Sequence, residues 1–294
     1  MLEAAHGGAI DVLYNVGGNL LATMPDTGWV HDALGRIRLR IHQDINVNSS
    51  TLIEPGEAVL LLPAQTRYEQ RDGGTSTSTE RRIRFSPEIP GHPQVGECRA
   101  EWEIPGQIAA AARPELQAAF AWSSGKALRE EMGRVMPVYS GIEHLNAEGD
   151  SLQWGGPMLC IDGDFSGMPG NRALFSPLVP PQLAVPPGHV VLTTRRGKQF
   201  NSMVFDRRDT LQGGRGRDDV FLSEEDAASL GVREGDPIIL RNELGRFQGV
   251  ARIGDLAPGG VQAYWPELNP LIPRGWDPIS EEPDYNAFVR LERG

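Results

Sequence analysis

A short β-type run at residues 190–194 is followed by a dense group of hydrogen-bonding side chains. Cations, carboxamides and hydroxyls occur there together, and charged donors bind oxyanions and planar polar groups more strongly than neutral donors do. We therefore expect a polar, planar, anionic ligand at this loop. The alternative is a solvated basic loop, which fits less well in an otherwise acidic chain. The expected ligand-binding residues are Thr194, Arg195, Arg196, Lys198, Gln199, Asn201 and Ser202.

A second candidate site follows the first apolar run of the chain, residues 10–16. Gly17 and Gly18 allow backbone N–H groups to come close to a phosphate, and Asn19 follows them. Taken alone, this pattern indicates only a turn, because it is not a full dinucleotide fingerprint. Asp44 ends a later strand-like run. Its carboxylate either caps a helix or accepts hydrogen bonds from guanine N–H groups.

The composition limits the class of protein. The chain has 294 residues, 39% of them hydrophobic, and a net charge of −11. An acidic surface does not displace the counterions of a nucleic acid, so no nucleic-acid partner is expected. The first residues lack the basic and apolar segments of a secretion signal, and no apolar run approaches the ~20 residues of a membrane helix. We expect a cytoplasmic protein without a membrane partner.

The two cysteines, Cys98 and Cys160, cannot build an iron–sulfur site and show no metal-ligand spacing. They form either one disulfide or, as expected in the cytosol, two reduced and buried thiols. The histidines show no metal spacing either. The sequence therefore names no metal ligand and no catalytic residue, and no iron–sulfur cluster is expected from this chain.

The order of expected elements divides the chain into three segments: 1–136, 137–187 and 188–294. The first has strand-like runs around a helical pattern that begins after Pro25 and stops at Gly35, which is typical of a parallel α/β sheet. The second is rich in Gly and Pro and indicates a connector. Within the first segment we expect strands at 10–16, 38–44 and 58–62, a polar irregular stretch at 68–100, and helices at 102–112, 114–121 and 126–132.

The third segment carries the clearest local signals. Ser223 and Asp226 form a capping box at the start of a short helix that ends at Gly231. Apolar runs on either side of the turn at 242–245 indicate a β-hairpin, in which Gly245 is expected to take a positive φ. These patterns predict a β-rich domain at the end of the chain.

Taken in order, these motifs resemble the C-terminal half of the molybdopterin oxidoreductases of the dimethyl-sulfoxide-reductase and formate-dehydrogenase superfamily. The strand and loop at 191–203 are similar to the family segment that wraps a pterin of the molybdenum cofactor. Gly17-Gly18-Asn19, followed by Pro25-Asp26, stands where the family contacts the guanosine diphosphate arm. The likeness runs from residue 10 to the end and is closest to formate-dehydrogenase-like alpha subunits.

A third family segment, which borders the cofactor, is similar to residues 69–82. Ser78 stands where the family more often has asparagine, which weakens any side-chain amide contact there. Near the end of the chain, single asparagines are of the type that both accepts from and donates to the amide edge of a pterin. The residues that these two resemblances add to the expected cofactor site are Thr75, Thr77, Glu80, Arg81, Asn269 and Asn286.

The resemblance implies a partial α/β nucleotide-binding domain, with a parallel sheet and helices, followed by a β-barrel of the double-psi, aspartate-decarboxylase-like type. It implies a molybdopterin guanine dinucleotide, carrying molybdenum or tungsten, as the cofactor of an oxidoreductase. In the family the metal belongs to an N-terminal half that these residues do not include. We expect that half to be supplied in cis or in trans, together with an electron-transfer partner.

Formate is the substrate that the nearest relatives suggest, and the residues themselves give it no independent support. No activity is expected without the metal-bearing half. The alternative is a non-catalytic cofactor-binding or scaffold module that lacks this half.

Overall fold

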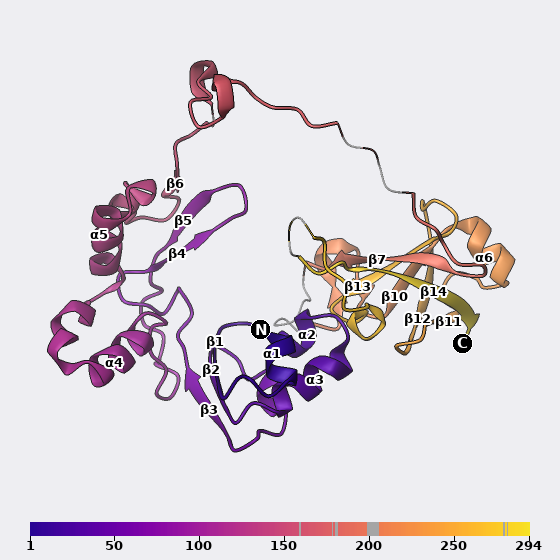
Figure 1. Cartoon of the computed structure of the whole chain (residues 1–294), viewed down its shortest axis with the longest axis horizontal. Helices are drawn as coiled ribbons and strands as arrows, with labels where there is room; N and C mark the ends of the chain where they lie inside the picture. The colour runs from indigo at the N-terminus through magenta and orange to yellow at the C-terminus, as the bar shows by residue number, and fades with distance from the viewer. Residues whose placement is uncertain (159, 178, 180–181, 199–205, 279, 281) are drawn as a thin grey trace. The chain divides into compact units, whose positions relative to one another are not determined.

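The computed structural model describes the chain except residues 159, 178, 180–181, 199–205, 279 and 281. The chain packs into two compact units, shown in Figure 1: residues Met1–Leu61 together with Gln182–Gly294, and residues Leu62–Pro181. The bounds of these units differ from those of the three segments expected from the sequence. The three segments stay a prediction. The first unit is therefore built from both ends of the chain.

The N-terminal part of the first unit is an α/β layer. Its three strands lie in the order β1-β2-β3, and β1 and β2 are parallel, with Val12 beside Leu39 and Val16 beside Gln43. This confirms the predicted parallel sheet with helices. The elements are α1 (Leu2–His6), β1 (Val12–Val16), α2 (Leu20–Thr23), α3 (Thr27–Gly35), β2 (Leu39–Asp44), the 3₁₀ turn η1 (Ser49–Leu52) and β3 (Ala58–Pro63).

One face of this sheet is packed against the helices, and it includes two basic residues. Arg40 and His42 alternate with outward residues on β2 and are 0% and 1% exposed. The Arg40 guanidinium donates to the carbonyl oxygen of Ile53. Both ring nitrogens of His42 are buried without a hydrogen-bond partner among the described residues. Burial lowers the pKa of His42, and the charge of Arg40 lowers it further.

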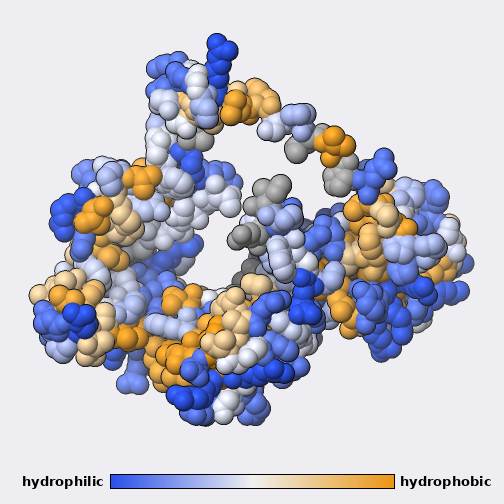
Figure 2. Space-filling view, viewed as in Figure 1, coloured by the Kyte–Doolittle hydropathy of each residue, from blue (hydrophilic) through white to orange (hydrophobic). Residues whose placement is uncertain are grey.

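Apolar side chains remain on the surface of the same layer. Figure 2 shows hydrophobic surface over the strands of the sheet. Val12 and Val16 on β1 are 49% and 56% exposed, and Leu60 and Leu61 on β3 are each 47% exposed. The apolar run at 58–62 is therefore a strand, as expected, although its side chains are only partly covered.

The C-terminal part of the first unit is a closed six-stranded barrel with the strand order β10-β12-β11-β14-β7-β13. A small hairpin, β8–β9, follows β7 in the sequence, and the helix α6 follows β10. Neither the hairpin nor the helix is part of the six-stranded ring. The elements are β7 (Val190–Arg196), β8 (Arg208–Asp209), η7 (Thr210–Gln212), β9 (Arg215–Gly216), β10 (Asp219–Leu222), α6 (Glu224–Leu230), β11 (Pro237–Arg241), β12 (Arg246–Ile253), β13 (Gly260–Trp265), η8 (Asn269–Leu271) and β14 (Asn286–Arg293).

The barrel has an internal two-fold pattern. The pairs β7/β13 and β10/β12 are parallel, and the other neighbours are antiparallel. Exchanging β7, β10 and β11 for β12, β13 and β14 converts every one of these pairings into another of the same direction. Two interlocked, equivalent halves of this kind form a double-psi barrel, so the predicted fold class is confirmed.

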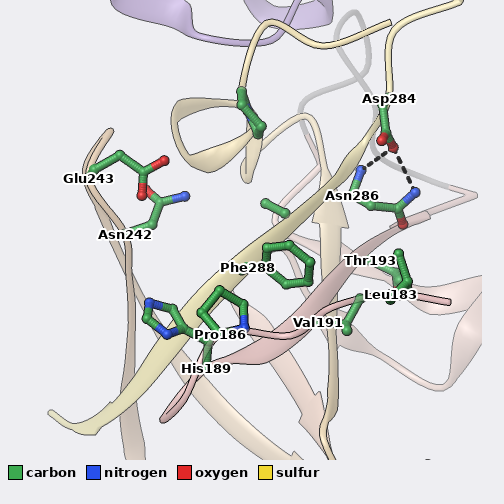
Figure 3. Close-up of a pocket in the computed structure, with 12 residues that line it drawn as sticks. Leu183, Pro186, His189, Val191, Thr193, Asn242, Glu243, Asp284, Asn286 and Phe288 are labelled. Atoms are coloured by element: carbon green, nitrogen blue, oxygen red, sulfur yellow. Dashed lines mark hydrogen bonds between the residues drawn. The ribbon is translucent and has the colours of Figure 1, made fainter. Parts of the chain in front are cut away.

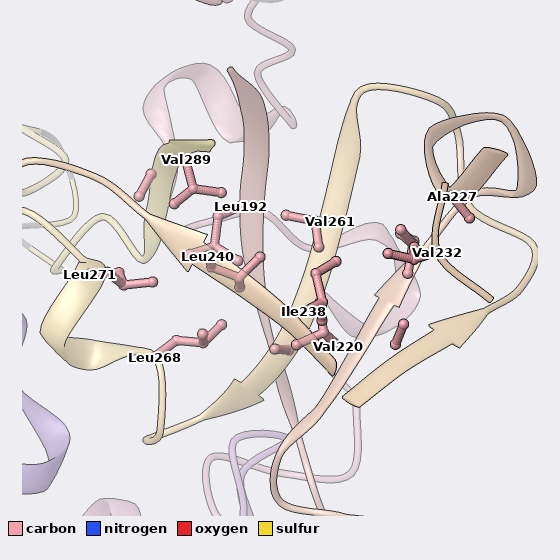
Figure 4. Close-up of a cluster of buried hydrophobic side chains, with 14 of the residues drawn as sticks. Leu192, Val220, Ala227, Val232, Ile238, Leu240, Val261, Leu268, Leu271 and Val289 are labelled. Atoms are coloured by element: carbon pink, nitrogen blue, oxygen red, sulfur yellow. The ribbon is translucent and has the colours of Figure 1, made fainter. Parts of the chain in front are cut away.

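The barrel is filled by one face of each strand. Figure 4 shows Leu192, Val220, Ile238, Leu240 and Val289 meeting inside the strand ring, and all five are 0% exposed. Because side chains alternate between the faces of a strand, the residues next to them in sequence point outward. The barrel core therefore fixes which side chains of β7 face outward.

Two local predictions in the barrel have different outcomes. The Ser223 hydroxyl accepts a hydrogen bond from the backbone N–H of Asp226, at 3.0 Å, and α6 ends at Gly231, which confirms the capping box. Gly245 does not take a positive φ, so that prediction is wrong. The carboxamide oxygen of Asn242 closes the hairpin turn instead, by accepting from the N–H groups of Leu244 and Gly245 at 3.0 and 3.3 Å.

The second unit pairs a small antiparallel sheet with helices. It corrects the expectation of an irregular stretch at 68–100, because residues there form a hairpin. Polar strands rich in Ser and Thr give no apolar alternation, so the pattern did not indicate them. The sheet has the order β4 (Gly74–Thr77), β5 (Arg82–Ser86) and β6 (Ser151–Gln153), and the main helical segments are α4 (Glu103–Ala112), the 3₁₀ segment η2 (Pro114–Phe120) and α5 (Gly125–Val135).

The expected connector at 137–187 is thus partly structured, since β6 lies within it and pairs with β5. The buried Arg129 of α5 ties this unit together by donating to the carbonyl oxygens of Gly73 and Leu145, each at 3.2 Å. Cys98 is buried and Cys160 partly buried, and both are free. Within the described part of the chain, no helix is long and apolar enough to span a membrane.

Replacing Leu240 by alanine is expected to lower the free energy of unfolding by about 2–5 kcal/mol, because a cavity is left in a close-packed core. Chemical denaturation followed by circular dichroism measures this change. Leu244, which is 39% exposed in the turn after the same strand, is the matched control. A Leu244→Ala change as costly as Leu240→Ala would contradict the assigned core.

The free energy of unfolding is expected to fall as the pH decreases from about 7.5 to about 5.5. In the unfolded chain His42 takes up a proton near its ordinary pKa of 6.5, whereas the folded state, with a lowered pKa, does not. Its contribution to stability is therefore present above that pH and is lost below it. Denaturant titrations should show a weaker pH dependence for His42→Gln. The variant of the exposed His31, His31→Gln, should retain the full dependence.

Candidate functional site

The loop after β1 leaves its backbone open. Gly17 and Gly18 have φ of 69° and 92°, and a Cβ built on either glycine would meet no atom within 4 Å. The N–H of Gly17 donates to the carbonyl oxygen of Gln43, at 2.8 Å, which continues the β1–β2 pairing into the loop. The two glycines therefore lie at the carboxyl ends of two parallel strands, the edge at which α/β sheets bind ligands.

Asn19 shapes this loop from inside. It is 1% exposed, and its side-chain oxygen accepts from the hydroxyls of Ser49 and Ser50 at 3.0 and 2.8 Å. The same oxygen accepts from the N–H of Ala22 at 3.3 Å and so caps α2. Asn19 thus joins the loop to η1, and its predicted contact with a ligand stays a prediction.

Asp44 lies on the next strand, at the same edge. Its carboxylate oxygens accept from the N–H of Asn46, at 3.3 Å, and from the carboxamide of Asn48, at 3.2 Å. The Asn48 carboxamide also donates to the carbonyl oxygen of Gly18, at 3.5 Å. A carboxylate has more acceptor positions than these two bonds use, so Asp44 keeps capacity for donors of a ligand.

Hydrogen bonds join this edge to the barrel within the first unit. The backbone N–H of Asp26 donates to the carbonyl oxygen of Asn269, at 3.2 Å. The Asn269 carboxamide donates to the carbonyl oxygen of Ala22, at 2.5 Å, and Tyr285 Oη donates to that of Thr23, at 2.8 Å. Asn269 is 1% exposed. Its side chain thus holds the barrel to α2, and a contact with a pterin stays a prediction.

The predicted cations on β7 separate onto different faces of the barrel. Arg195 pairs with Tyr264 across β7 and β13, points outward, and lies over the ring of Phe221 at 4.2 Å from its centroid. Arg196, the next residue, lies over the ring of Trp265 at 3.5 Å from its centroid. Successive side chains of a strand point in opposite directions, so Arg195 and Arg196 cannot both face one small ligand.

Arg196 lies on the side of the barrel that meets α2. Burial raises the pKa of Tyr285, and the nearby charge of Arg196 works against that increase. Tyr285 itself is bonded to Thr23, at the end of the helix that follows the glycine loop. Arg196 and Trp265 therefore lie near the N-terminal edge. Thr194 shares its strand face with the core residue Leu192, and its predicted contact with a ligand stays a prediction.

Asp209 holds the backbone just after β7, a role that sequence reasoning missed. It is 0% exposed, and its carboxylate accepts from the N–H of Lys198 at 2.5 Å and from that of Leu211 at 3.1 Å. Nothing in the arginine-rich run around it distinguishes this residue in the sequence. The predicted Gln199, Asn201 and Ser202 lie outside the described residues.

A cavity of about 520 Å³ opens on the outer face of β7 and β14, as Figure 3 shows. Val191, Thr193 and Phe288 form its floor, and the predicted Asn286 lines it. The N–H and the carboxamide of Asn286 donate to the carboxylate of Asp284 at 3.0 and 2.8 Å. The side-chain oxygen of Asn286 makes neither of these bonds and is the atom suited to a ligand's N–H.

The residues predicted from the third family segment gather at the β4–β5 hairpin of the second unit. Thr75 and Thr77 pair with Phe85 and Ile83, and Arg81 has φ of 66° in the turn. The Arg81 guanidinium donates to the carbonyl oxygen of Trp154, at 2.7 Å. The nearby Ser78 hydroxyl is the main cause that lowers the pKa of the exposed Glu80. These residues form a set of their own within that unit.

The donors and acceptors of the first unit fit a guanine dinucleotide. The exposed backbone of Gly17 and Gly18 and the carboxylate of Asp44 lie at one edge of the sheet. Arg196, stacked on Trp265, lies on the adjoining side of the barrel. Diphosphate oxygens, guanine N–H groups and a flat pterin need these partners. Among the described residues, no group of three or more His, Cys, Asp or Glu side chains could hold a metal ion.

Comparison with known families and sequences agrees with this donor set. Residues 190–289 match the family model "Molydopterin dinucleotide binding domain". The chain is 29% identical over 291 residues to a subunit of an NADH-quinone oxidoreductase from Rhizobium meliloti, covering 96% of this chain and 31% of the relative. It is 26% identical to F420-dependent formate dehydrogenase 1 subunit alpha of Methanococcus maripaludis, covering 97% of this chain and 43% of the relative.

A solved structure shares the fold. Acetylene hydratase from Pelobacter acetylenicus superposes with a TM-score of 0.65 at 14% identity, over 100% of this chain and 46% of that one. The chain thus spans less than half the length of these relatives. It is related to the molybdopterin oxidoreductases, as its motifs predicted, and carries a molydopterin dinucleotide binding domain at residues 190–289.

Proposed function

We propose that this chain holds the guanosine and pterin parts of a molybdopterin guanine dinucleotide within a molybdenum or tungsten oxidoreductase. The observation that carries this proposal is the pair of hydrogen bonds between the barrel and α2, the helix that follows the two glycines. Asn269 and Tyr285 of the barrel fix Ala22 and Thr23 of α2. The nucleotide edge and the pterin-binding domain thereby become one ligand surface.

Each part of this surface has a chemical role. The open N–H groups at Gly17 and Gly18 suit the diphosphate, and the Asp44 carboxylate suits the N1–H and amino group of guanine. Arg196 and Lys198 supply charge to the anionic ligand, with Arg196 kept flat by Trp265. The bound cofactor supplies the redox chemistry of its metal, while these residues orient it.

The proposed activity of the whole protein needs residues other than those of this surface. Relatives of this chain include formate dehydrogenase alpha subunits, so we propose a formate-dehydrogenase-like oxidoreductase. The relatives are more than twice as long as the part that this chain matches. We propose that the metal ligand, the catalytic residues and the route to an electron-transfer partner come from that additional length, supplied in cis or in trans.

Titration of the chain with GDP by isothermal calorimetry is the direct test. Asp44→Asn is expected to weaken GDP binding by about tenfold or more, because a hydrogen bond to a charged group contributes about 1.5–3 kcal/mol. ADP lacks the guanine donors, so its weaker binding should not change. Asp32→Asn, at an exposed position on α3, is the matched control. Equal GDP affinity of the wild type and Asp44→Asn would refute the guanine assignment, and no GDP binding at all would refute the proposal.

The charge of Arg196 gives a separate expectation. Arg196→Gln should weaken GDP binding several-fold at low ionic strength and reduce its dependence on salt, because screening acts on the lost charge–phosphate attraction. Calorimetry at two salt concentrations measures both effects. Arg246→Gln removes an exposed cation elsewhere on the barrel and should leave both unchanged. A salt dependence identical in all three proteins would rule out a phosphate contact by Arg196.

A further inference from the structure

The inner face of β2 carries three polar residues in a row. Arg40, His42 and Asp44 occupy alternate positions of the strand, and all three are buried. Alternate residues of a strand share one face and follow one another at about 6–7 Å. The row therefore places an ionisable ring between a permanent cation and a carboxylate.

The two basic residues of this row contribute few bonds to the fold. The Arg40 guanidinium donates to the carbonyl oxygen of Ile53, and its Nε and Nη1 atoms have no hydrogen-bond partner among the described residues. In the same described part of the chain, the two ring nitrogens of His42 have no partner either. A strand of a parallel sheet that packs against helices is ordinarily apolar, and unpaired buried donors are rare. Packing alone therefore does not account for basic residues at these two positions.

The third member of the row lies at the edge of the sheet that is assigned to guanine. The Asp44 carboxylate accepts from the N–H of Asn46 and from the carboxamide of Asn48, and it keeps capacity for donors of a ligand. His42 is the residue before it on the same face of β2. A neutral ring leaves this capacity to the ligand. An imidazolium attracts the carboxylate and offers N–H groups that compete with those of guanine.

The surroundings of His42 oppose the charged form of its ring. Burial is the main cause that lowers the pKa of His42, the charge of Arg40 lowers it further, and the charge of Asp44 acts in the opposite direction. The residue opposite on β1, Asn15, is uncharged, and Tyr14 lies on the other face of the sheet. Among the described elements around β2, the segments β1, α2, η1 and β3 carry no charged side chain, and the two ionisable side chains of α3 are more than half exposed. Arg40 is thus the fixed charge that keeps the ring neutral.

We propose that His42 is a positioning residue of the guanine site: as a neutral ring beside Asp44 it leaves this carboxylate free for the N–H groups of guanine, and Arg40 keeps the ring neutral. This inference rests on the proposed function, because that function assigns guanine to Asp44, and it adds the residue that controls the contact. Protonation of His42 and binding of guanine then oppose each other, since each lowers the affinity for the other. The preference for guanine should therefore be present above the pKa of folded His42, which lies below 6.5, and be lost as the pH decreases through it.

The test compares GDP with ADP, whose diphosphate groups titrate alike, so that the ratio of the two affinities reports on the base alone. Isothermal calorimetry on the full chain should give a preference for GDP that decreases at least about fivefold from about pH 7.5 to about pH 5, the lower end of the usual coupling between two sites. His42→Leu and His42→Gln cannot take up the proton, and both should keep a constant preference over this range. His31→Gln removes an exposed histidine and should retain the wild-type profile. A constant preference in the wild type, or the same decrease in both His42 variants, would overturn the inference.

A variant of Arg40 tests the other half of the row. Arg40→Gln removes the charge that opposes the imidazolium, so the preference for GDP should be lost at a higher pH than in the wild type. The double variant Arg40→Gln/His42→Leu should show no pH dependence of this preference, because the effect of Arg40 passes through the ring. Circular dichroism at each pH identifies the range in which each variant is folded. An Arg40→Gln profile identical to that of the wild type would overturn the role of Arg40.

Nuclear magnetic resonance of the histidine rings gives the reciprocal test on the unaltered chain, without the need for any variant to fold. Saturating GDP should lower the pKa of His42, and saturating ADP should change it less. GDP binding that Asp44→Asn weakens, together with a His42 pKa that GDP does not change, would overturn this inference and leave the proposed function standing. Absence of GDP binding would overturn both.

Discussion

The junction at Asp26 is the constraint on which the rest of the first unit depends. Its backbone N–H is held by the carbonyl oxygens of Asn269 and Ile272, at 3.2 and 3.0 Å. Its carboxylate caps α3 and pairs with Arg274, at 3.2 Å. The residue has φ of 52°, a left-handed conformation that aspartate tolerates better than most residues. One residue thus fixes the start of α3, the end of the α2 turn and the position of the barrel beside them.

Much of the fold could be predicted from local signals, because each signal acts within a few residues. The capping hydroxyl of Ser223, the strand predicted at 190–194 and the separate strands β1 and β2 are of this kind. The polar hairpin around Arg81 could not be predicted, since its strands carry no apolar alternation. The role of Asp209 was equally hidden, because it depends on a backbone N–H eleven residues away.

For the candidate site, the sequence identifies residues that the structure uses, but it does not identify the role of each one. The sequence predicts Asn19 and Asn269 as ligand contacts, yet each directs its carboxamide into the protein, where it joins two segments of the chain. A motif does not distinguish a side chain that touches a ligand from one that shapes the loop around it. The adjacent arginines of β7 show a second limit: they form one basic cluster in the sequence, whereas the alternation of the strand divides them between two faces.

The first unit also sets the order in which the protein can acquire its structure. The bond between Tyr285 and Thr23 joins residues 262 positions apart, and the whole second unit is inserted between them. During synthesis, α2 emerges long before the barrel residues that hold it. The N-terminal layer therefore lacks its contacts with Asn269 and Tyr285 until those residues have been made. The inserted unit has its own sheet and helices and can fold in the meantime. During this interval a chaperone or a partner protein could cover the surface of α2 that the barrel later contacts.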